Sequence, residues 1–189
     1  MKRLNFYLAA NLLGMLCCAN AWGGNTINYT SSEGTIDPYD SSAFGEAKIV
    51  SNTCEDGQGV ITFDGDLTTI GNYAFEYCSS LESVTLPEGL TTIGSWAFSG
   101  CSSLESITFP ESMTTIGDYA FSHCSYLSSI NIPKNVTTID ECAFCDCPDL
   151  QSITVDGENE VYDSRNDCNA IIETATRLRQ TRQPYRTDP

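Results

Sequence analysis

The sequence repeats with a period of 23 residues, and this feature limits the possible folds more than any other. Residues 67–89 read LTTIGNYAFEYCSSLESVTLPEG, and residues 90–112 read LTTIGSWAFSGCSSLESITFPES. Two more copies follow without a gap, at residues 113–135 and 136–160. One block is too short to bury its own apolar side chains, whereas stacked blocks bury a continuous core. The chain is therefore expected to form a repeat domain over residues 67–160.

The repeat unit predicts one strand and one tighter segment in each coil. Residues 106–109, SITF, alternate polar and apolar side chains, which is typical of a short strand. A proline follows this segment in three copies and would end the strand: Pro87, Pro110 and Pro133. The IGxxAFxxC part has apolar positions three and four residues apart and predicts a turn or a short helical segment. We expect an α/β-type repeat, a right-handed solenoid with short parallel strands on one sheet face.

Both flanks of the repeats depart from the 23-residue pattern. Residues 22–66 form an expected N-terminal cap region, in which GVITFDGD aligns with the second half of a block and Ile61 falls in the column of Val84. Caps protect the core and the open sheet edge of a solenoid. Residues 161–189 form a C-terminal segment. It begins with one more expected strand pair and ends in RLRQTRQPYRTDP, which is basic, polar and expected to be disordered.

The N-terminus has the pattern of a secretory signal peptide over residues 1–21. Lys2 and Arg3 precede an apolar run from Leu4 to Cys18, and Ala19-Asn20-Ala21 is a cleavage pattern. The sequence has no second apolar segment long enough to cross a bilayer. We expect a protein that is secreted or held at the cell surface, does not span the membrane, and is cleaved after Ala21.

The charge of the chain excludes two classes of partner. Residues 22–163 contain 22 acidic and two basic residues, a net charge of −20. Such a surface repels nucleic acid and anionic lipid. The Asp-Gly-Asp at residues 64–66 lacks the rest of a calcium-binding loop. The sequence therefore predicts no cofactor and no metal, and the acidic residues are interpreted as a solvated surface.

The A-F-x-x-C core and the I-x-x-P ending of each block resemble the BspA-type leucine-rich repeat of bacterial surface proteins. The resemblance covers residues 58–160. It implies an exported, non-enzymatic repeat protein; some members bind host matrix proteins or other bacteria, and many have no known ligand. Members of this type tend to continue with further repeats where this chain has its basic C-terminal segment. A truncated structural fragment without its own ligand is therefore the alternative to a binding module.

Each repeat carries one cysteine in the same column: Cys78, Cys101, Cys124 and Cys147. A disulfide needs Cβ atoms about 3.8 Å apart on converging bonds, which in-register residues of stacked coils do not readily offer. Free cysteine also behaves as a small buried hydrophobe. Although exported chains usually form disulfides, the repeat geometry favours an inward ladder of unpaired thiols.

The other cysteines of the mature chain are Cys54, Cys142, Cys145 and Cys168. A local bridge between Cys142 and Cys145 and a bridge from Cys145 to Cys168 both remain open. Cys142, Cys145 and Cys147 form C-x-x-C-x-C, but no fourth ligand is evident from the spacing, so a metal site is disfavoured.

An enzyme is disfavoured because no group of catalytic residues stands out. His123 adjoins Cys124, but a cysteine of the buried ladder is expected to be inert. No serine lies in a G-x-S-x-G motif, and the sequence has no phosphate-binding glycine loop.

A binding function has one candidate site. Tyr73, Trp96 and Tyr119 share the column before A-F, and an exposed aromatic row could bind a protein or a glycan of a host or bacterial surface. Alternatively, the rings lie flat and shield the coil. We expect an adhesin-like module, with self-association through the solenoid ends as a further option.

Overall fold

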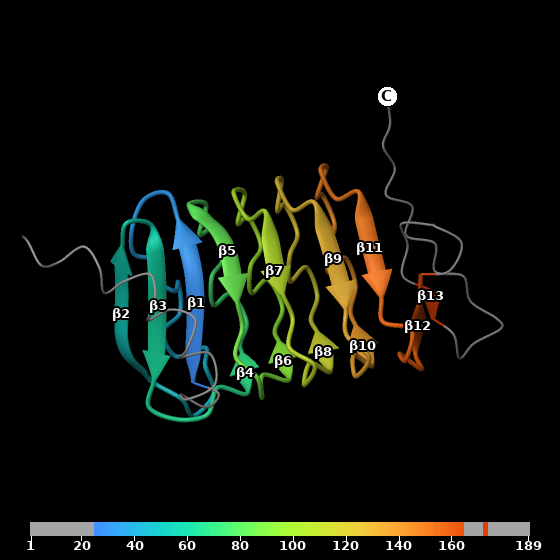
Figure 1. Ribbon diagram of the computed structural model, residues 1–189, viewed down its shortest axis with the longest axis horizontal. Helices are drawn as coiled ribbons and strands as arrows, with labels where there is room; N and C mark the ends of the chain where they lie inside the picture. The colour runs from blue at the N-terminus through green and yellow to red at the C-terminus, as the bar shows by residue number, and fades with distance from the viewer. Residues whose placement is uncertain (1–24, 165–171, 174–189) are drawn as a thin grey trace, which may run out of the picture.

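The computed structural model describes residues 25–164 and 172–173. The expected signal peptide, Cys168 and residues 174–189 of the basic segment lie outside the described residues. The described chain is a parallel-strand solenoid whose N-terminal end is covered by antiparallel strands (Figure 1). No helix in this part of the chain is long and apolar enough to cross a membrane.

The expected parallel strands are present, one in each coil. They are β5 (Leu81–Thr85), β7 (Ser106–Thr108), β9 (Ser129–Ile132) and β11 (Ser152–Val155). The strands β5 and β7 pair in parallel with Val84 opposite Ile107, and β9 and β11 pair with Ile130 opposite Ile153. Each pairing joins residues 23 positions apart, because alternate apolar side chains must enter the core at the same height of every coil.

The coils also form a second ladder, where the sequence predicted only one sheet face. The two-residue strands β4 (Thr69–Ile70), β6 (Thr92–Ile93), β8 (Thr115–Ile116) and β10 (Thr138–Ile139) make a four-stranded parallel sheet. The preceding threonines support it: Thr91 donates its N–H and its hydroxyl to the carbonyl oxygen of Thr68, at 2.9 and 3.0 Å. The expectation of a single sheet face was therefore wrong. The sequence did not reveal the second ladder, because strands of two residues are too short to show an alternation of polar and apolar side chains.

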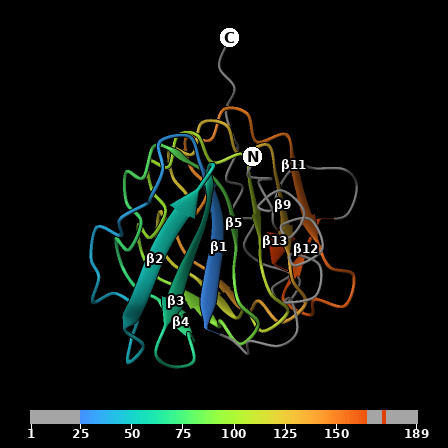
Figure 2. The same ribbon diagram turned by 60° about the vertical axis from the view of Figure 1, so that its left-hand side comes forward.

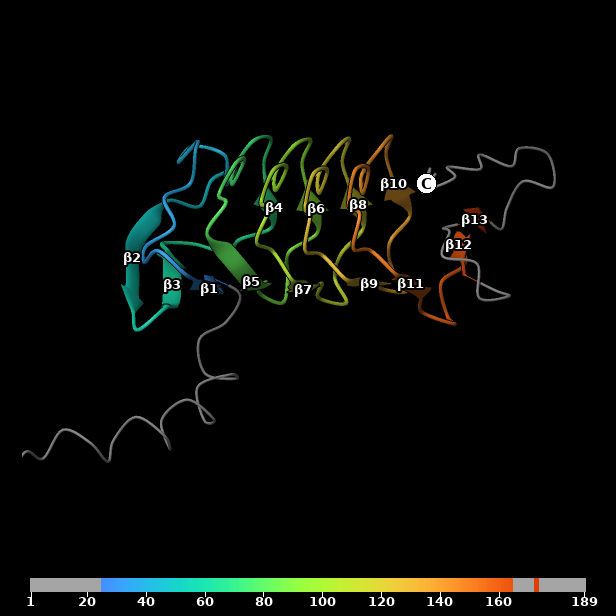
Figure 3. The same cartoon turned by 90° about the horizontal axis from the view of Figure 1, so that it is seen from above.

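The AF segment of each coil consists of turns, and no helix occurs within residues 25–164. The expected short helical form is therefore not adopted. The N–H groups of Tyr73, Phe75 and Tyr77 donate to carbonyl oxygens of the next coil, at 3.0, 2.7 and 2.8 Å, rather than to carbonyls four residues earlier in the same coil. These turns lie on the side of the solenoid away from β5, β7, β9 and β11 (Figure 3).

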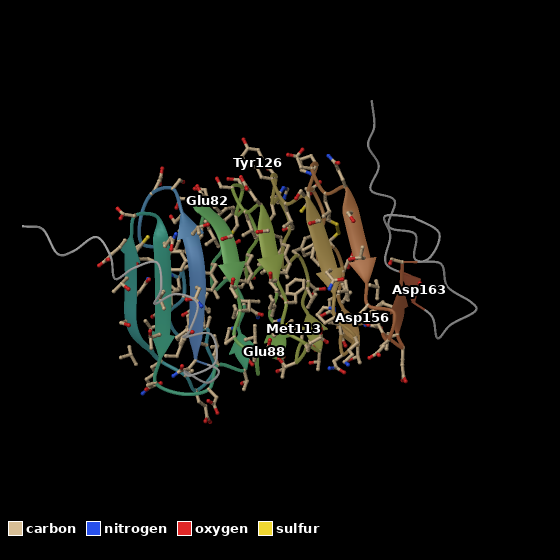
Figure 4. The ribbon with its side chains drawn as sticks, in the orientation of Figure 1. Glu82, Glu88, Met113, Tyr126, Asp156 and Asp163 are labelled. Carbon is tan, nitrogen blue, oxygen red and sulfur yellow. A yellow bond between two sulfur atoms is a disulfide. The ribbon has the colours of Figure 1, made fainter. Side chains whose placement is uncertain are left out.

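A ladder of stacked phenylalanine rings runs through the core. Ring centroids are 5.1 Å apart between Phe75 and Phe98, 5.2 Å between Phe98 and Phe121, and 5.5 Å between Phe121 and Phe144. The cap continues the ladder, because the ring of Phe44 lies 5.8 Å from that of Phe75. Met113 (Figure 4) begins the third block and is buried in the same core, as are the residues that begin the other blocks: Leu67, Leu90 and Val136.

Three strands close the N-terminal end: β1 (Thr26–Ser31), β2 (Ile49–Glu55) and β3 (Gln58–Phe63). The order in the sheet is β2-β3-β1-β5-β7 (Figure 1), and Figure 2 shows its first four strands from the capped end. The strand β3 is the half-block identified in the sequence, but it does not pair with β5. Strand β1 lies between them and is antiparallel to both, with Tyr29 opposite Val84.

The C-terminal end is covered by a turn and by the expected strand pair. Strands β12 (Tyr162–Asp163) and β13 (Ile172–Glu173) pair in an antiparallel manner. The buried side chain of Asn159 donates to the carbonyl oxygens of Pro133 and Val136, at 2.8 and 3.1 Å. The phenol oxygen of Tyr162 accepts from the N–H of Ile139 at 2.8 Å, and so covers the last strand of the second ladder.

Candidate ligand-binding face

The aromatic row stands on backbone that large side chains rarely adopt. The φ angles of Tyr73, Trp96 and Tyr119 are 62°, 61° and 54°. For residues other than glycine, this left-handed region costs about 1–2 kcal/mol per residue, and Asn and Asp tolerate it best. The inter-coil hydrogen bonds at these positions hold the conformation: Trp96 donates to the carbonyl oxygen of Asp118 at 2.9 Å, and Tyr119 to that of Glu141 at 3.0 Å.

Trp96 and Tyr119 stack face to face. Their ring centroids are 4.5 Å apart and the ring planes differ by 14°. Two near-parallel rings lying side by side in one plane cannot come so close, so these rings do not lie flat on the coil. Both side chains are half-buried, whereas Tyr73 is 44% exposed. The row thus consists of a stacked, half-buried pair and the more exposed Tyr73.

A second column of left-handed residues runs beside the row, at Tyr77, Gly100, His123 and Asp146. Tyr77 leans over the next coil, because a Cβ added to Gly100 would lie 2.5 Å from its Cδ1 atom. Only glycine leaves room for this ring. The exposed His123 faces the exposed Asp146 at 3.7 Å, and Cys124 is buried behind it. The histidine and the thiol therefore do not meet as a nucleophile and base.

The repeat cysteines lie behind the turns, and those of the last three coils are buried. The thiols of Cys101, Cys124 and Cys147 are free and donate to the carbonyl oxygens of Phe75, Phe98 and Phe121 in the preceding coil, at 3.1, 3.2 and 3.1 Å. Burial raises the pKa of Cys101 well above its ordinary value. A hydrogen bond with Cys147, together with burial, raises that of Cys124. Thiols held in the protonated state are poor nucleophiles.

Cys78 differs from these three because it lies at the junction with the cap, where it is half-buried. Burial, and then the nearby charge of Asp37, raise its pKa to about 11. Since the thiolate is the reactive form, its alkylation by iodoacetamide should rise about tenfold per pH unit from pH 7 to 10. Peptide mass mapping would measure this rate, with Cys101 as the control that stays unmodified until the protein is unfolded. A rate that levels off below pH 9 would contradict the burial argument.

Of the two cysteine bridges left open by the sequence, the structure contains the local one, Cys142–Cys145. It closes the turn of the last coil at the column that holds Tyr73, Trp96 and Tyr119 in the earlier coils. Cys54 is free, and Cys168 lies outside the described residues. Within residues 25–164, no group of three or more His, Cys, Asp or Glu side chains is placed to hold a metal ion.

Parallel coils of 23 residues around a leucine, isoleucine and phenylalanine core define a leucine-rich-repeat solenoid. The sequence matches the BspA type Leucine rich repeat region, in six copies over residues 48–168. The protein therefore belongs to the BspA-type leucine-rich-repeat family, as the resemblance implied. The matched range extends beyond the four regular blocks at both ends. Proteins with this repeat and fold are typically non-enzymatic.

Several solved structures are similar to part of this chain. A leucine rich cell surface protein from Faecalibacterium prausnitzii is 28% identical, with a TM-score of 0.45, over 57% of this chain and 33% of that one. The pneumococcal vaccine antigen PcpA is 27% identical, with a TM-score of 0.48, over 58% and 32%. A leucine-rich repeat protein from Eubacterium ventriosum is 28% identical, with a TM-score of 0.47, over 59% and 35%. The chain thus covers about a third of each of these proteins. A comparison with curated proteins gives no match.

Proposed function

We propose that the protein is an exported cell-surface module that binds a protein or glycan partner, in the manner of an adhesin, through Tyr73, Trp96 and Tyr119. One observation carries the proposal: all three large aromatic residues have left-handed φ angles, where glycine or asparagine would cost less free energy. Costly backbone conformations cluster at ligand-binding sites, because there the side chain is needed for more than folding.

The face also has the properties of a preorganised binding surface. The stack of Trp96 on Tyr119 fixes both rings before any partner arrives, so that little side-chain entropy remains to be lost on binding. Tryptophan and tyrosine are the side chains most often found at the energetic centres of interfaces. Two exposed rings next to the row, Tyr77 and Tyr39, enlarge the apolar area. The repeat alignment does not single out either residue. The other coils have no tyrosine in the column of Tyr77, and Tyr39 lies in the cap, outside the repeats.

The direct test replaces the row without disturbing its backbone. Tyr73→Asn, Trp96→Asn and Tyr119→Asn are combined, since asparagine tolerates the left-handed region better than alanine does. The full-length chain is screened against immobilised extracellular-matrix proteins and a glycan array. We expect saturable binding by the wild type and at least about 30-fold weaker binding by the triple variant, because central interface residues each contribute about 2 kcal/mol or more.

The matched control is Tyr126→Asn. Tyr126 is 59% exposed, belongs to neither column of left-handed residues, and lies at the edge of the solenoid near the start of β9 (Figure 4). The Tyr126→Asn variant should bind as the wild type does. The circular dichroism spectra of the wild type, the triple variant and the Tyr126→Asn variant should agree. Equal affinity of the triple variant and the wild type would remove the row from the binding function.

A further inference from the structure

A patch of exposed tyrosines lies where the cap meets the first coil. It consists of Tyr39, Tyr73 and Tyr77, which are 73%, 44% and 68% exposed, and we call it the tyrosine patch. The N–H of Tyr39 donates to the carbonyl oxygen of Ala74 at 2.9 Å. The thiol of Cys78 reaches the carbonyl oxygen of Asp37 at 3.8 Å. The cap segment thus runs along the first AF turn and brings Tyr39 beside residues 73–78.

The rings of this patch stand on a rigid backbone. Tyr73 and Tyr77 have φ angles of 62° and 58°, and their N–H groups donate to the carbonyl oxygens of Ser95 and Ser99 in the next coil. The ring of Tyr77 lies against Gly100, which leaves its opposite side toward solvent. Tyrosines with two side-chain torsions and a fixed backbone offer contact area at low entropic cost.

Three acidic residues adjoin the patch in sequence, and none of them forms an ion pair within the described part of the chain. Asp37 and Asp40 are exposed, and Glu76 lies between Tyr73 and Tyr77. The ion pairs within residues 25–164 are His123–Asp146 and Lys134–Glu158, and neither involves this region. Hydrogen bonds from the hydroxyl and the N–H of Ser42 hold the pKa of Asp40 below its usual range, so that it stays ionised in mild acid.

The combination of open aromatic rings and unpaired carboxylates selects for positive charge. A guanidinium or ammonium group is attracted to the face of a tyrosine ring, and the attraction adds to that of a nearby carboxylate. The net charge of −20 over residues 22–163 repels anionic partners and steers cationic ones toward the protein. We propose that the tyrosine patch binds an arginine- or lysine-rich polypeptide segment of a partner protein. This inference rests on the proposed binding function, because Tyr73 belongs to both surfaces.

The test must separate binding at the patch from diffuse attraction to an acidic protein. The probe is a fluorescent synthetic peptide of eight arginines spaced by glycine and serine, titrated with full-length protein at physiological salt, where long-range attraction is screened. A peptide with glutamate in place of arginine is the negative probe. We expect saturable binding of the arginine peptide with one site per chain, and no binding of the glutamate peptide.

The deciding variant is Tyr39→Asn with Tyr77→Asn, which leaves every charge in place. We expect its affinity for the arginine peptide to fall at least about tenfold. Tyr126→Asn should leave the affinity unchanged, and the double variant Tyr39→Phe with Tyr77→Phe should keep most of it, because the rings are retained. Circular dichroism and the thermal midpoint of each variant check that the fold is intact.

Three outcomes would overturn the inference. The first is unchanged affinity in the asparagine double variant, which would leave only diffuse attraction. The second is no saturable binding of the arginine peptide by a folded wild type. The third is loss of matrix-protein or glycan binding in the same double variant without any binding of the arginine peptide, which would assign the patch a different partner. The screen with the triple variant of the aromatic row is a separate measurement, so the proposed binding function can stand if the arginine peptide does not bind.

Discussion

Phe98→Ala is expected to lower the free energy of unfolding by about 3–5 kcal/mol, the range for large-to-small changes at fully buried aromatic sites. Phe98 is 0% exposed and stacks on Phe75 and Phe121 at 5.1 and 5.2 Å. Its removal leaves a cavity in the middle of the ring ladder. The coils on either side are joined through the β4–β10 ladder and through the hydrogen bonds between the AF turns, so they cannot readily collapse to fill it.

Urea unfolding followed by circular dichroism would measure this loss, together with the slope of the transition. A lower slope would show that the solenoid no longer unfolds as one unit, as can happen in repeat proteins when a central interface is weakened. Phe144→Ala is the matched variant, since Phe144 stacks on Phe121 at the last coil and its neighbourhood is freer to relax. Phe144→Ala should lower the free energy of unfolding by less than Phe98→Ala does. A loss below about 1 kcal/mol for Phe98→Ala would mean that the core tolerates the cavity.

Asn159→Ala is expected to lower the free energy of unfolding by about 2–3 kcal/mol, because it removes all four hydrogen bonds of a buried amide side chain. The Asn159 amide donates to the carbonyl oxygens of Pro133 and Val136, and its Oδ1 accepts from the N–H groups of Val161 and Tyr162, at 2.9 and 2.8 Å. One side chain therefore holds the covering turn to the last coil. Without it, the ring of Tyr162 should also separate from the end of the second ladder.

The loss should be local as well as global. Hydrogen exchange at the N–H of Ile139, which donates to Tyr162, should accelerate more than exchange at the N–H of Gly94 in the second coil. Asn135→Ala is the control, since Asn135 is exposed and its amide makes a single bond to the carbonyl oxygen of Glu111. It should change stability by no more than about 0.5 kcal/mol. Equal effects of the two variants would show that the covering turn contributes little to stability.

The sequence by itself determined which residues stack. The columns of Phe98 and of Ile107 repeat every 23 positions, and a core that is continuous along a solenoid requires that in-register residues meet. The parallel strands, their register and the positions of the buried cysteines follow from this period. The strand pair after the fourth block was also predictable, from apolar residues separated by a polar connection.

Only the tertiary structure decided the features that have no period. Strand β1 lies between β3 and β5 and is antiparallel to both, and its alternating Ile27 and Tyr29 are buried in the core. Ile61 of β3 and Val84 of β5 are 23 positions apart in the sequence, so the repeat period alone does not reveal a strand between them. The N–H of Trp96 donates to the next coil and φ at Trp96 is positive, whereas the local apolar spacing left a turn and a short helical segment both open. Tyr39 donates its N–H to the carbonyl oxygen of Ala74 only because the cap folds back along the first coil, and a contact between an irregular segment and a repeat cannot be derived from the repeat.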